Sequence, residues 1–193
     1  MKPALIIIEG AQGVGKTTVT DYIRNKMPYT NLYRLSGHSD ITKEGYNKSK
    51  KMYNDLFDYM KNLENTDVNL LFDRTFFSEE VYTRLGYKEY SFTDLYEELL
   101  IKLNNLDFDI YYFVLSLKNV ELFKERLDRK DKAKVKYVDF DISNSVKQQN
   151  MYLQTAKEVK EKCNNVKVYT LENDKTNQAI DFIQELFVER WKK

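Results

Sequence analysis

Apolar residues along the chain gather in short continuous runs that are separated by longer stretches of mixed polarity. Runs of this kind, rich in β-branched and aromatic residues, are typical of strands buried on both faces of a parallel sheet. The run at residues 31–35, which follows Pro28, is less apolar than the others. We expect strands at residues 4–8, 31–35, 68–73, 109–115 and 166–171.

The stretches between these runs carry apolar residues at the three-and-four spacing of amphipathic helices. We expect helices at residues 14–26, 45–63, 76–85, about 91–103, 119–127, 139–162 and 176–191. Strands that alternate with helices in this way predict an α/β fold: a doubly wound, five-stranded parallel sheet with helices on both faces.

The first strand ends at Gly10, and the residues after it fit the spacing G-x-x-x-x-G-K-[ST] through Gly15, Lys16 and Thr17. In this P-loop motif the glycines turn backbone N–H groups inward around a polyphosphate, the lysine reaches the β and γ oxygens, and the hydroxyl can ligate Mg²⁺. The strand-turn-helix context argues against a chance glycine-rich turn. We therefore expect a magnesium–nucleoside triphosphate to be bound by Gly10, Gln12, Gly13, Val14, Gly15, Lys16, Thr17 and Thr18.

A second group of candidates follows the third strand, where Asp73 and Arg74 stand at its carboxyl end. A carboxylate on the strand beside the P-loop strand can hold Mg²⁺, usually through water, so Thr17 and Asp73 are the expected metal-site residues. Arg74 would point into the same cleft and grip a phosphate with two N–H groups. The alternative is that this pair only caps the next helix, which offers Ser78 and Tyr82 to the pocket.

A third group follows the fourth strand, where two of the seven arginines, Arg126 and Arg129, stand three residues apart at a helix end. A basic segment that closes over a triphosphate stabilises charge on the transferring group and excludes water. We expect such a lid at about residues 126–138, although a lysine-rich solvated loop is the ordinary explanation for a charge run. The expected catalytic residues are Lys16, Asp73, Arg74, Arg126 and Arg129.

Composition bounds the class of protein. A chain of 193 residues supports one domain with a real core, so residues 1–193 are expected to form a single domain. The net charge of +1 creates no overall electrostatic field that would point to a nucleic-acid or membrane partner. One cysteine excludes an intramolecular disulfide, and one histidine cannot form a metal site alone. The first strand leaves no room for a signal peptide and no apolar run reaches the ~18 residues of a membrane span, so we expect a cytoplasmic protein.

With the P-loop on the first strand, an Asp-Arg after the third and a basic segment after the fourth, the chain resembles the nucleoside and nucleoside-monophosphate kinases of the P-loop superfamily. Thymidylate kinase is one of the two nearest patterns. Asp73-Arg74-Thr75, Ser78 and Tyr82 match its Asp-Arg motif in place, whereas Val81 and Thr83 differ from the Ala and Gln that it carries there.

The other pattern is that of the deoxyribonucleoside kinases. Thr75 and Ser78 also suit their Glu-Arg-Ser motif, and Arg126 with Arg129 resembles the R-x-x-R lid segment of both families. The resemblance implies strand order 2-3-1-4-5 and phosphoryl transfer from ATP to a nucleoside or nucleotide. It also implies a homodimer formed by the helices after the second and third strands.

The segment after the second strand departs from both families. Thymidylate kinases carry Arg-Glu-Pro-Gly-Gly there, and deoxyribonucleoside kinases carry Glu-Pro, whose Glu resembles a general base for a 5′-hydroxyl. Residues 34–40 of this chain keep Arg34 and Gly37 but lack the Glu-Pro. A hydroxyl acceptor gains about 10²–10⁴-fold from a positioned base, whereas a phosphate acceptor needs positive groups instead. We therefore expect a deoxynucleoside monophosphate acceptor, held by Arg74 and Arg34.

Alternatives remain for the acceptor. Asp40 or Glu44 could replace the missing base, which would make the chain a deoxynucleoside kinase. Tyr53 and Phe57 either belong to the core or border a base pocket, because a nucleobase stacks on aromatic rings. Lysines within 130–136 could hold nucleic acid, or a modified base in it, as the acceptor, although the net charge of +1 counts against this. The expected acceptor-binding residues are Arg34, Asp40, Tyr53, Phe57, Arg74, Ser78 and Tyr82.

A nucleotide-binding module without catalytic activity is the last alternative. Such a module would have no evident need for an Asp-Arg pair or for lid arginines. The sequence therefore favours an enzyme, a nucleoside or nucleotide kinase that uses ATP and Mg²⁺.

Overall fold

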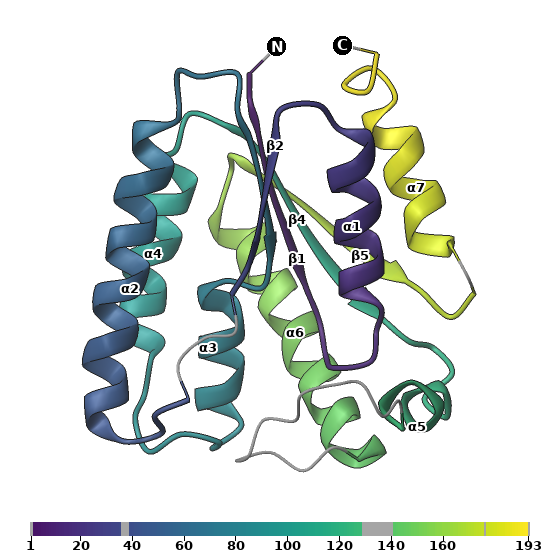
Figure 1. The fold of residues 1–193 in the computed structure, drawn as a ribbon. Coiled ribbons are helices and arrows are strands. Elements are labelled where there is room, and N and C mark those ends of the chain that lie inside the picture. The colour runs from purple at the N-terminus through teal and green to yellow at the C-terminus, as the bar shows by residue number, and fades with distance from the viewer. Residues whose placement is uncertain (1, 36–38, 129–140, 176, 193) are drawn as a thin grey trace.

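A computed structural model of the chain describes residues 2–35, 39–128, 141–175 and 177–192. Within these residues, five strands form one parallel sheet in the order β2-β3-β1-β4-β5 (Figure 1). The strands are β1 (Ala4–Glu9), β2 (Thr30–Arg34), β3 (Asn69–Asp73), β4 (Asp109–Ser116) and β5 (Val166–Glu172). The predicted α/β class, the five strands and the order implied by the resemblance are confirmed.

Helices connect the strands as the spacing of apolar residues predicts, with small shifts at their ends. They are α1 (Lys16–Lys26), α2 (Lys43–Asn62), α3 (Phe76–Arg84), α4 (Thr93–Asn104), α5 (Leu122–Leu127), α6 (Ile142–Lys162) and α7 (Gln178–Phe187). α5 begins three residues later than predicted, at Leu122 instead of residue 119, and α6 begins at Ile142 instead of residue 139. The turn before α5 is held by the Asp174 carboxylate, which accepts hydrogen bonds from the backbone N–H groups of Lys118 and Asn119 at 2.8 and 2.9 Å.

The helices form two layers, one on each face of the sheet (Figure 1). Alternate residues of the fully buried strand β1 point to opposite faces. Leu5 and Ile7 join a core made with α2, α3, α4 and α6, and Ile6 and Ile8 join a second core made with α1, α5 and α7. The doubly wound arrangement therefore follows from a central strand that is apolar on both sides.

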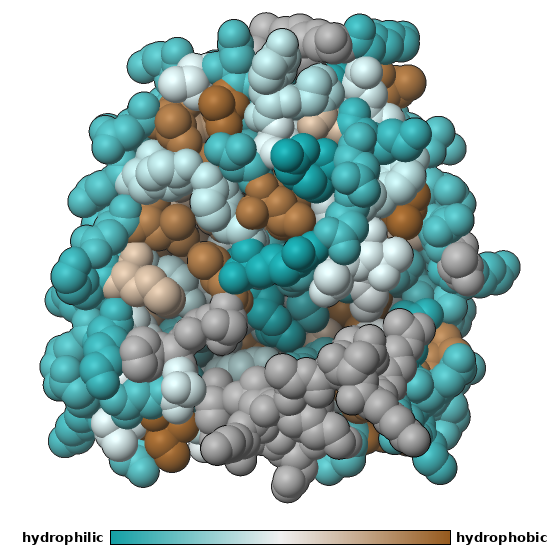
Figure 2. All heavy atoms as spheres, in the orientation of Figure 1, coloured by the Kyte–Doolittle hydropathy of each residue, from teal (hydrophilic) through white to brown (hydrophobic). Residues whose placement is uncertain are grey.

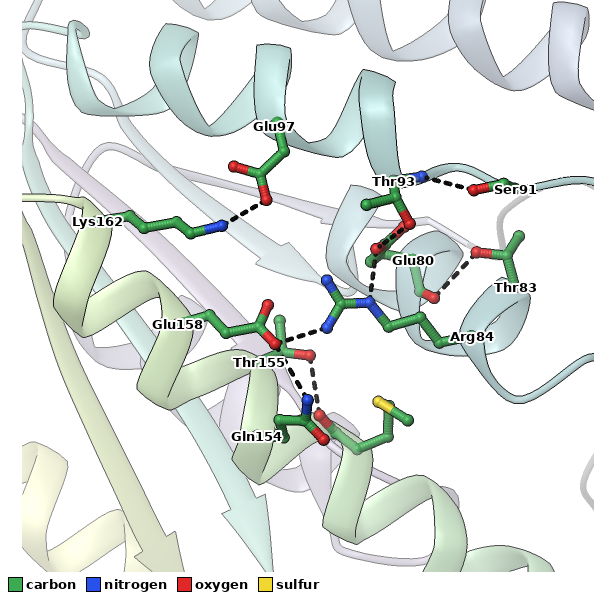
Figure 3. A network of polar contacts seen from close by, with 11 residues as sticks. Glu80, Thr83, Arg84, Ser91, Thr93, Glu97, Gln154, Thr155, Glu158 and Lys162 are labelled. Carbon is green, nitrogen blue, oxygen red and sulfur yellow. Dashed lines mark hydrogen bonds and ion pairs between the residues drawn. The ribbon is translucent and has the colours of Figure 1, made fainter.

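A polar junction joins α3, α4 and α6, which lie on the same face of the sheet (Figure 3). Arg84 of α3 donates from Nε to Glu80 Oε1 at 2.6 Å and from Nη1 to Glu158 Oε1 of α6 at 2.7 Å. Thr93 of α4 donates to the same Glu80 oxygen at 2.9 Å. Lys162 and Glu97 add an ion pair of 2.5 Å between α6 and α4. The junction fixes α6 against α3, and both helices carry residues of the site described below.

On the face shown in Figure 2, hydrophobic residues form small separate patches among hydrophilic ones. Among the described residues, no helix is both long enough and apolar enough to cross a membrane. The surface therefore offers no extended apolar belt on the face shown.

Candidate active site

The P-loop links the end of β1 to the start of α1 at the edge where the carboxyl ends of the strands meet. Gly10 has φ of 140°, and a Cβ atom there would lie 2.5 Å from the backbone oxygen of Leu115 on β4. Gly15, the residue before α1, has φ of 94°, and a Cβ atom would lie 2.6 Å from Nδ2 of Asn173. Only glycine suits these two positions, because each combines a left-handed backbone with close neighbours.

Lys16 lies across this loop with 7% of its surface exposed. Its Nζ donates to the backbone oxygens of Gly10 at 3.0 Å and Ala11 at 2.8 Å. A triphosphate in the loop would offer stronger, charged acceptors to the same ammonium group. The described position is therefore one from which Lys16 can exchange a carbonyl contact for a phosphate contact.

Two residues outside the motif hold the loop in place. Asn173, just after β5, donates from Nδ2 to the Val14 oxygen at 2.7 Å and accepts a bond from Ala179 N at 3.3 Å through Oδ1. Arg126 of α5 donates to the backbone oxygens of Asn173 at 2.9 Å, Asp174 at 3.0 Å and Gly13 at 3.4 Å. Arg126 thus lies beside the P-loop, as its expected role requires, and it connects the loop to β5.

The rest of the predicted lid lies outside the described residues. This applies to Arg129 and to positions 129–138, which include the lysines that suggested a nucleic-acid acceptor. Arg129 and the lid therefore stay predictions.

Thr17 and Asp73 meet at the predicted metal site. Asp73 ends β3, in register with Ile8 of the neighbouring β1, and Thr17 Oγ1 donates to Asp73 Oδ2 at 3.3 Å. The described residues hold no cluster of three or more histidine, cysteine or acidic side chains that could enclose a metal ion. One hydroxyl and one carboxylate nevertheless fit Mg²⁺, which keeps several waters and takes its other oxygens from nucleotide phosphates. We expect these two residues to hold it.

Arg34 of β2 lies at the same edge. Its Nε is 4.0 Å from Asp73 Oδ2, and its Nη2 pairs with Asp21 of α1. Half of its side chain is exposed. Arg34 therefore borders the predicted metal site from the β2 side, where a phosphate could reach it.

Arg74 belongs to a buried polar network. Its φ of 74° is left-handed, and its Nη1 donates to Ser78 Oγ at 3.0 Å and to the Tyr152 hydroxyl at 2.9 Å. Ser78 Oγ lies 2.7 Å from that hydroxyl and donates to Glu9 Oε2 at 2.7 Å. Glu9 Oε1 accepts bonds from Thr75 N at 2.6 Å and Thr75 Oγ1 at 3.2 Å. Burial raises the pKa of Glu9, while the charge of Arg74 and the hydrogen bond from Ser78 oppose that rise.

The predicted aromatic residues divide between core and site. Tyr53 and Phe57 of α2 are 1% and 3% exposed and pack on Phe76, with ring centroids 6.3 and 5.7 Å away. They have the placement of core residues, which agrees with the core interpretation of this stripe. Tyr82 of α3 lies at Arg74, whose guanidinium carbon is 5.9 Å from the ring centroid.

Asp40 caps a helix. Its Oδ1 accepts bonds from Thr42 N at 3.0 Å and Thr42 Oγ1 at 2.7 Å, and its Oδ2 pairs with Lys48 at 2.8 Å. Hydrogen bonds from Lys48 and Thr42 hold the pKa of this carboxyl well below its usual range. A general base must take up a proton, so these contacts argue against Asp40 in that role. The same bonds hold Thr42, after which α2 begins at Lys43 instead of residue 45.

Three residues of the site were not assigned a role from the sequence: Glu9, Tyr152 and Asn173. Glu9 carried a signal that could have revealed it, because a carboxylate that ends an otherwise apolar buried strand must find partners. Tyr152 and Asn173 carried none, since their partners Ser78 and Val14 are 74 and 159 residues away in sequence.

Solved structures share this fold at low sequence identity. Thymidylate kinase from Candida albicans aligns with a TM-score of 0.66 at 17% identity, over 98% of this chain and 94% of its own. Deoxyadenosine kinase from M. mycoides, with dCMP and dCDP bound, aligns with a TM-score of 0.65 at 15% identity, over 96% of this chain and 99% of its own. The YorR protein from Bacillus subtilis, in complex with phosphorylated GDP, aligns with a TM-score of 0.61 at 20% identity, over 96% of both chains.

No protein-family model matches the sequence, and no curated protein matches it. The structural similarity nevertheless covers nearly the whole chain in each case. The chain therefore has the P-loop nucleotide kinase fold, and the similarity to thymidylate kinase and a deoxynucleoside kinase is confirmed at the level of the fold.

Proposed function

We propose that this protein transfers the γ-phosphoryl group of ATP to a deoxynucleoside monophosphate, with Mg²⁺ as cofactor. The observation that carries the proposal is the guanidinium of Arg74, fixed through Nη1 beside the meeting point of Thr17 and Asp73. Among the described residues, neither Nη2 nor Nε of Arg74 has a hydrogen-bond partner. An arginine with two N–H directions left is suited to a phosphate, which accepts two parallel bonds.

The surroundings of Arg74 favour an anionic acceptor over a hydroxyl. Deprotonating a 5′-hydroxyl calls for an accessible carboxylate. Two acidic candidates are engaged, whereas Glu44, exposed in the first turn of α2, remains the alternative base. Asp40 is bound by Thr42 and Lys48, and Glu9 is fully buried under Thr75 and Ser78. A monophosphate needs no such base, because its oxygen is already a nucleophile.

In the transfer, an acceptor phosphate oxygen forms a bond to the γ-phosphorus as the bond to the bridging oxygen of ADP breaks. The P-loop N–H groups hold the donor, and Lys16 moves from its carbonyl contacts to the β and γ oxygens. Arg74 orients the acceptor phosphate in line, and Arg34 adds positive charge beside it. Mg²⁺, when bound at Thr17 and Asp73, supplies neutralisation of the phosphate charge.

The test is a panel of every deoxynucleoside and every deoxynucleoside monophosphate with Mg-ATP, followed by ADP release. We expect turnover with at least one monophosphate, loss of turnover in Lys16→Ala and Arg74→Ala, and a preserved fold in both. Lys26→Ala, at the exposed end of the same helix as Lys16, is the matched control and should keep full turnover. Turnover with free nucleosides alone, or unchanged turnover in Arg74→Ala, would contradict the proposal.

A further inference from the structure

Glu9 is a fully buried carboxylate that the proposed function does not use. It ends β1, immediately before the P-loop, and has none of its surface exposed. Burying a carboxylate is costly unless hydrogen bonds and opposite charge compensate it. Glu9 has both, because three protein groups donate to it and Arg74 lies at the far end of the same network.

The number of protons on each group determines the direction of every hydrogen bond in this network. A serine or tyrosine hydroxyl has one proton to donate. Ser78 gives its proton to Glu9 Oε2, so its oxygen can only accept from Tyr152, 2.7 Å away. Tyr152 has then given its proton to Ser78, so its oxygen accepts from Arg74 Nη1 at 2.9 Å. The bonds run in one direction, from Arg74 through Tyr152 and Ser78 to Glu9.

This order of hydrogen bonds fixes the Arg74 guanidinium through one nitrogen, Nη1. Both N–H groups that face the network belong to Nη1, which bonds Ser78 at 3.0 Å and Tyr152 at 2.9 Å. These two bonds fix the plane of the guanidinium group, and neither Nη2 nor Nε takes part in them. The left-handed backbone at φ 74° is unfavourable for a non-glycine residue, so the surrounding contacts must hold this arginine in it.

We propose that Glu9 and Tyr152 are positioning residues, which act through Ser78 to hold Arg74 ready for the acceptor phosphate. The proposal rests on the proposed function for the identity of the acceptor. Tyr152 lies in α6 and Glu9 in β1, so the network makes the orientation of Arg74 depend on both elements. Neither side chain needs to touch the acceptor.

Tyr152→Phe is the sharpest test, because it removes one hydroxyl and keeps the buried ring. A lost hydrogen bond to a charged group corresponds to an increase of about 10- to 100-fold in the KM of the acceptor. The KM of ATP should stay unchanged. The matched control is Tyr96→Phe, since the Tyr96 hydroxyl is also buried but has no hydrogen-bond partner among the described residues. An equal rise of both KM values in Tyr152→Phe, or an equal effect of Tyr96→Phe, would overturn the proposal.

Glu9→Gln tests the direction of the bonds. The amide of glutamine can donate to Ser78, which would reverse the order and leave Arg74 facing a donor. We expect the acceptor KM to rise at least as much as in Tyr152→Phe. Glu9→Asp keeps the charge and should raise the acceptor KM less than Glu9→Gln does. An unchanged acceptor KM in Glu9→Gln, which fills the same space, would show that Glu9 only fills space. If the Glu9 variants do not fold, Tyr152→Phe still decides.

A double-mutant cycle shows whether Tyr152 acts through Arg74. In Arg74→Lys, the further change Tyr152→Phe should have no additional effect on the acceptor KM. Additive effects would overturn the proposal. The cycle uses whichever acceptor the wild type converts, so a nucleoside acceptor would refute the monophosphate assignment and leave the positioning test intact.

A second measurement does not depend on activity. Rotation of the Arg74 guanidinium about its Nε–Cζ bond can be followed by ¹⁵N NMR, and the chain has only seven arginines to resolve. We expect slow rotation in the wild type and in Tyr96→Phe, and faster rotation in Tyr152→Phe. Equal rates in all three proteins would overturn the proposal even if no acceptor were found.

Discussion

At the scale of single residues, the contact between Thr17 Oγ1 and Asp73 Oδ2 joins two motifs that are 56 residues apart in sequence. Asp73 is 7% exposed, and the half-exposed Arg34 lies 4.0 Å from its Oδ2. The positive charge of the neighbouring Arg74 also acts on Asp73, while the Arg74 hydrogen bonds go to Ser78 and Tyr152. We expect Asp73 to help hold Mg²⁺.

Asp73→Asn removes this charge while it keeps the size of the side chain. We expect the Mg²⁺ concentration needed for half-maximal turnover to rise by about 10–100-fold, because one oxygen partner of the ion loses its charge. The measurement is a Mg²⁺ titration of turnover at fixed ATP. Asp21→Asn is the control, since Asp21 is an exposed partner of the same Arg34 and should leave the titration unchanged. An unaltered Mg²⁺ requirement in Asp73→Asn would remove Asp73 from the metal site.

At the scale of the elements, the junction of α3, α4 and α6 depends on one cation. Arg84 pairs with Glu80, which is fully buried, and with Glu158, and its guanidinium lies over the Tyr96 ring at 5.5 Å (Figure 3). Burial raises the pKa of Glu80, and the bond from Arg84 opposes the rise. Without Arg84, two carboxylates would face each other across the helices.

Arg84→Met is therefore expected to lower the free energy of unfolding by about 3–5 kcal/mol, as for other buried pairs that lose one partner. Lys162→Met is the control at the same junction, because Lys162 and Glu97 form a pair that is nearly half exposed. That change should cost about 0–1 kcal/mol. Urea denaturation of the two variants measures both values. Equal losses would show that Arg84 does not stabilise the junction more than the exposed pair does.

At the scale of the whole molecule, the core that α2, α3, α4 and α6 make with the sheet buries several tyrosine hydroxyls. Tyr53, Tyr112 and Tyr152 are fully buried, and burial is the largest cause that raises the pKa of each. Burial also raises the pKa of Tyr96. The folded protein keeps these four protons at a pH where an unfolded chain loses them, near 10.

Stability should therefore fall as the pH rises above about 10, because the unfolded state then binds fewer protons than the folded state. Each tyrosine contributes about 1.4 kcal/mol per pH unit, so four contribute about 5–6 kcal/mol per unit. Unfolding free energies measured between pH 9 and 11 test this. Tyr112→Phe should reduce the slope by about a quarter. A free energy of unfolding that stays constant up to pH 11 would contradict the expectation.

Patterns within the sequence were enough to predict the strands and helices, the P-loop and the Asp-Arg pair. Apolar runs and three-and-four spacing predicted every strand and helix of the described residues. Burial of a strand or of one helix face requires a pattern of apolar residues close together in sequence, and such a pattern can be seen before the fold is known. The P-loop and the Asp-Arg pair were predictable for a similar reason. Their chemistry depends on residues adjacent in sequence, placed at strand ends that a parallel sheet brings together.

The side chains that contact these motifs could be identified only from the folded chain. Ser78 meets Glu9 across 69 residues, and Asn173 meets Val14 across 159. Asp40 bonds Thr42 and Lys48, and Tyr53 packs in the core against Phe76 of α3. Each outcome depends on the direction of a side chain relative to a distant element. No spacing within the sequence encodes that direction, because it is set when the helices pack on the sheet.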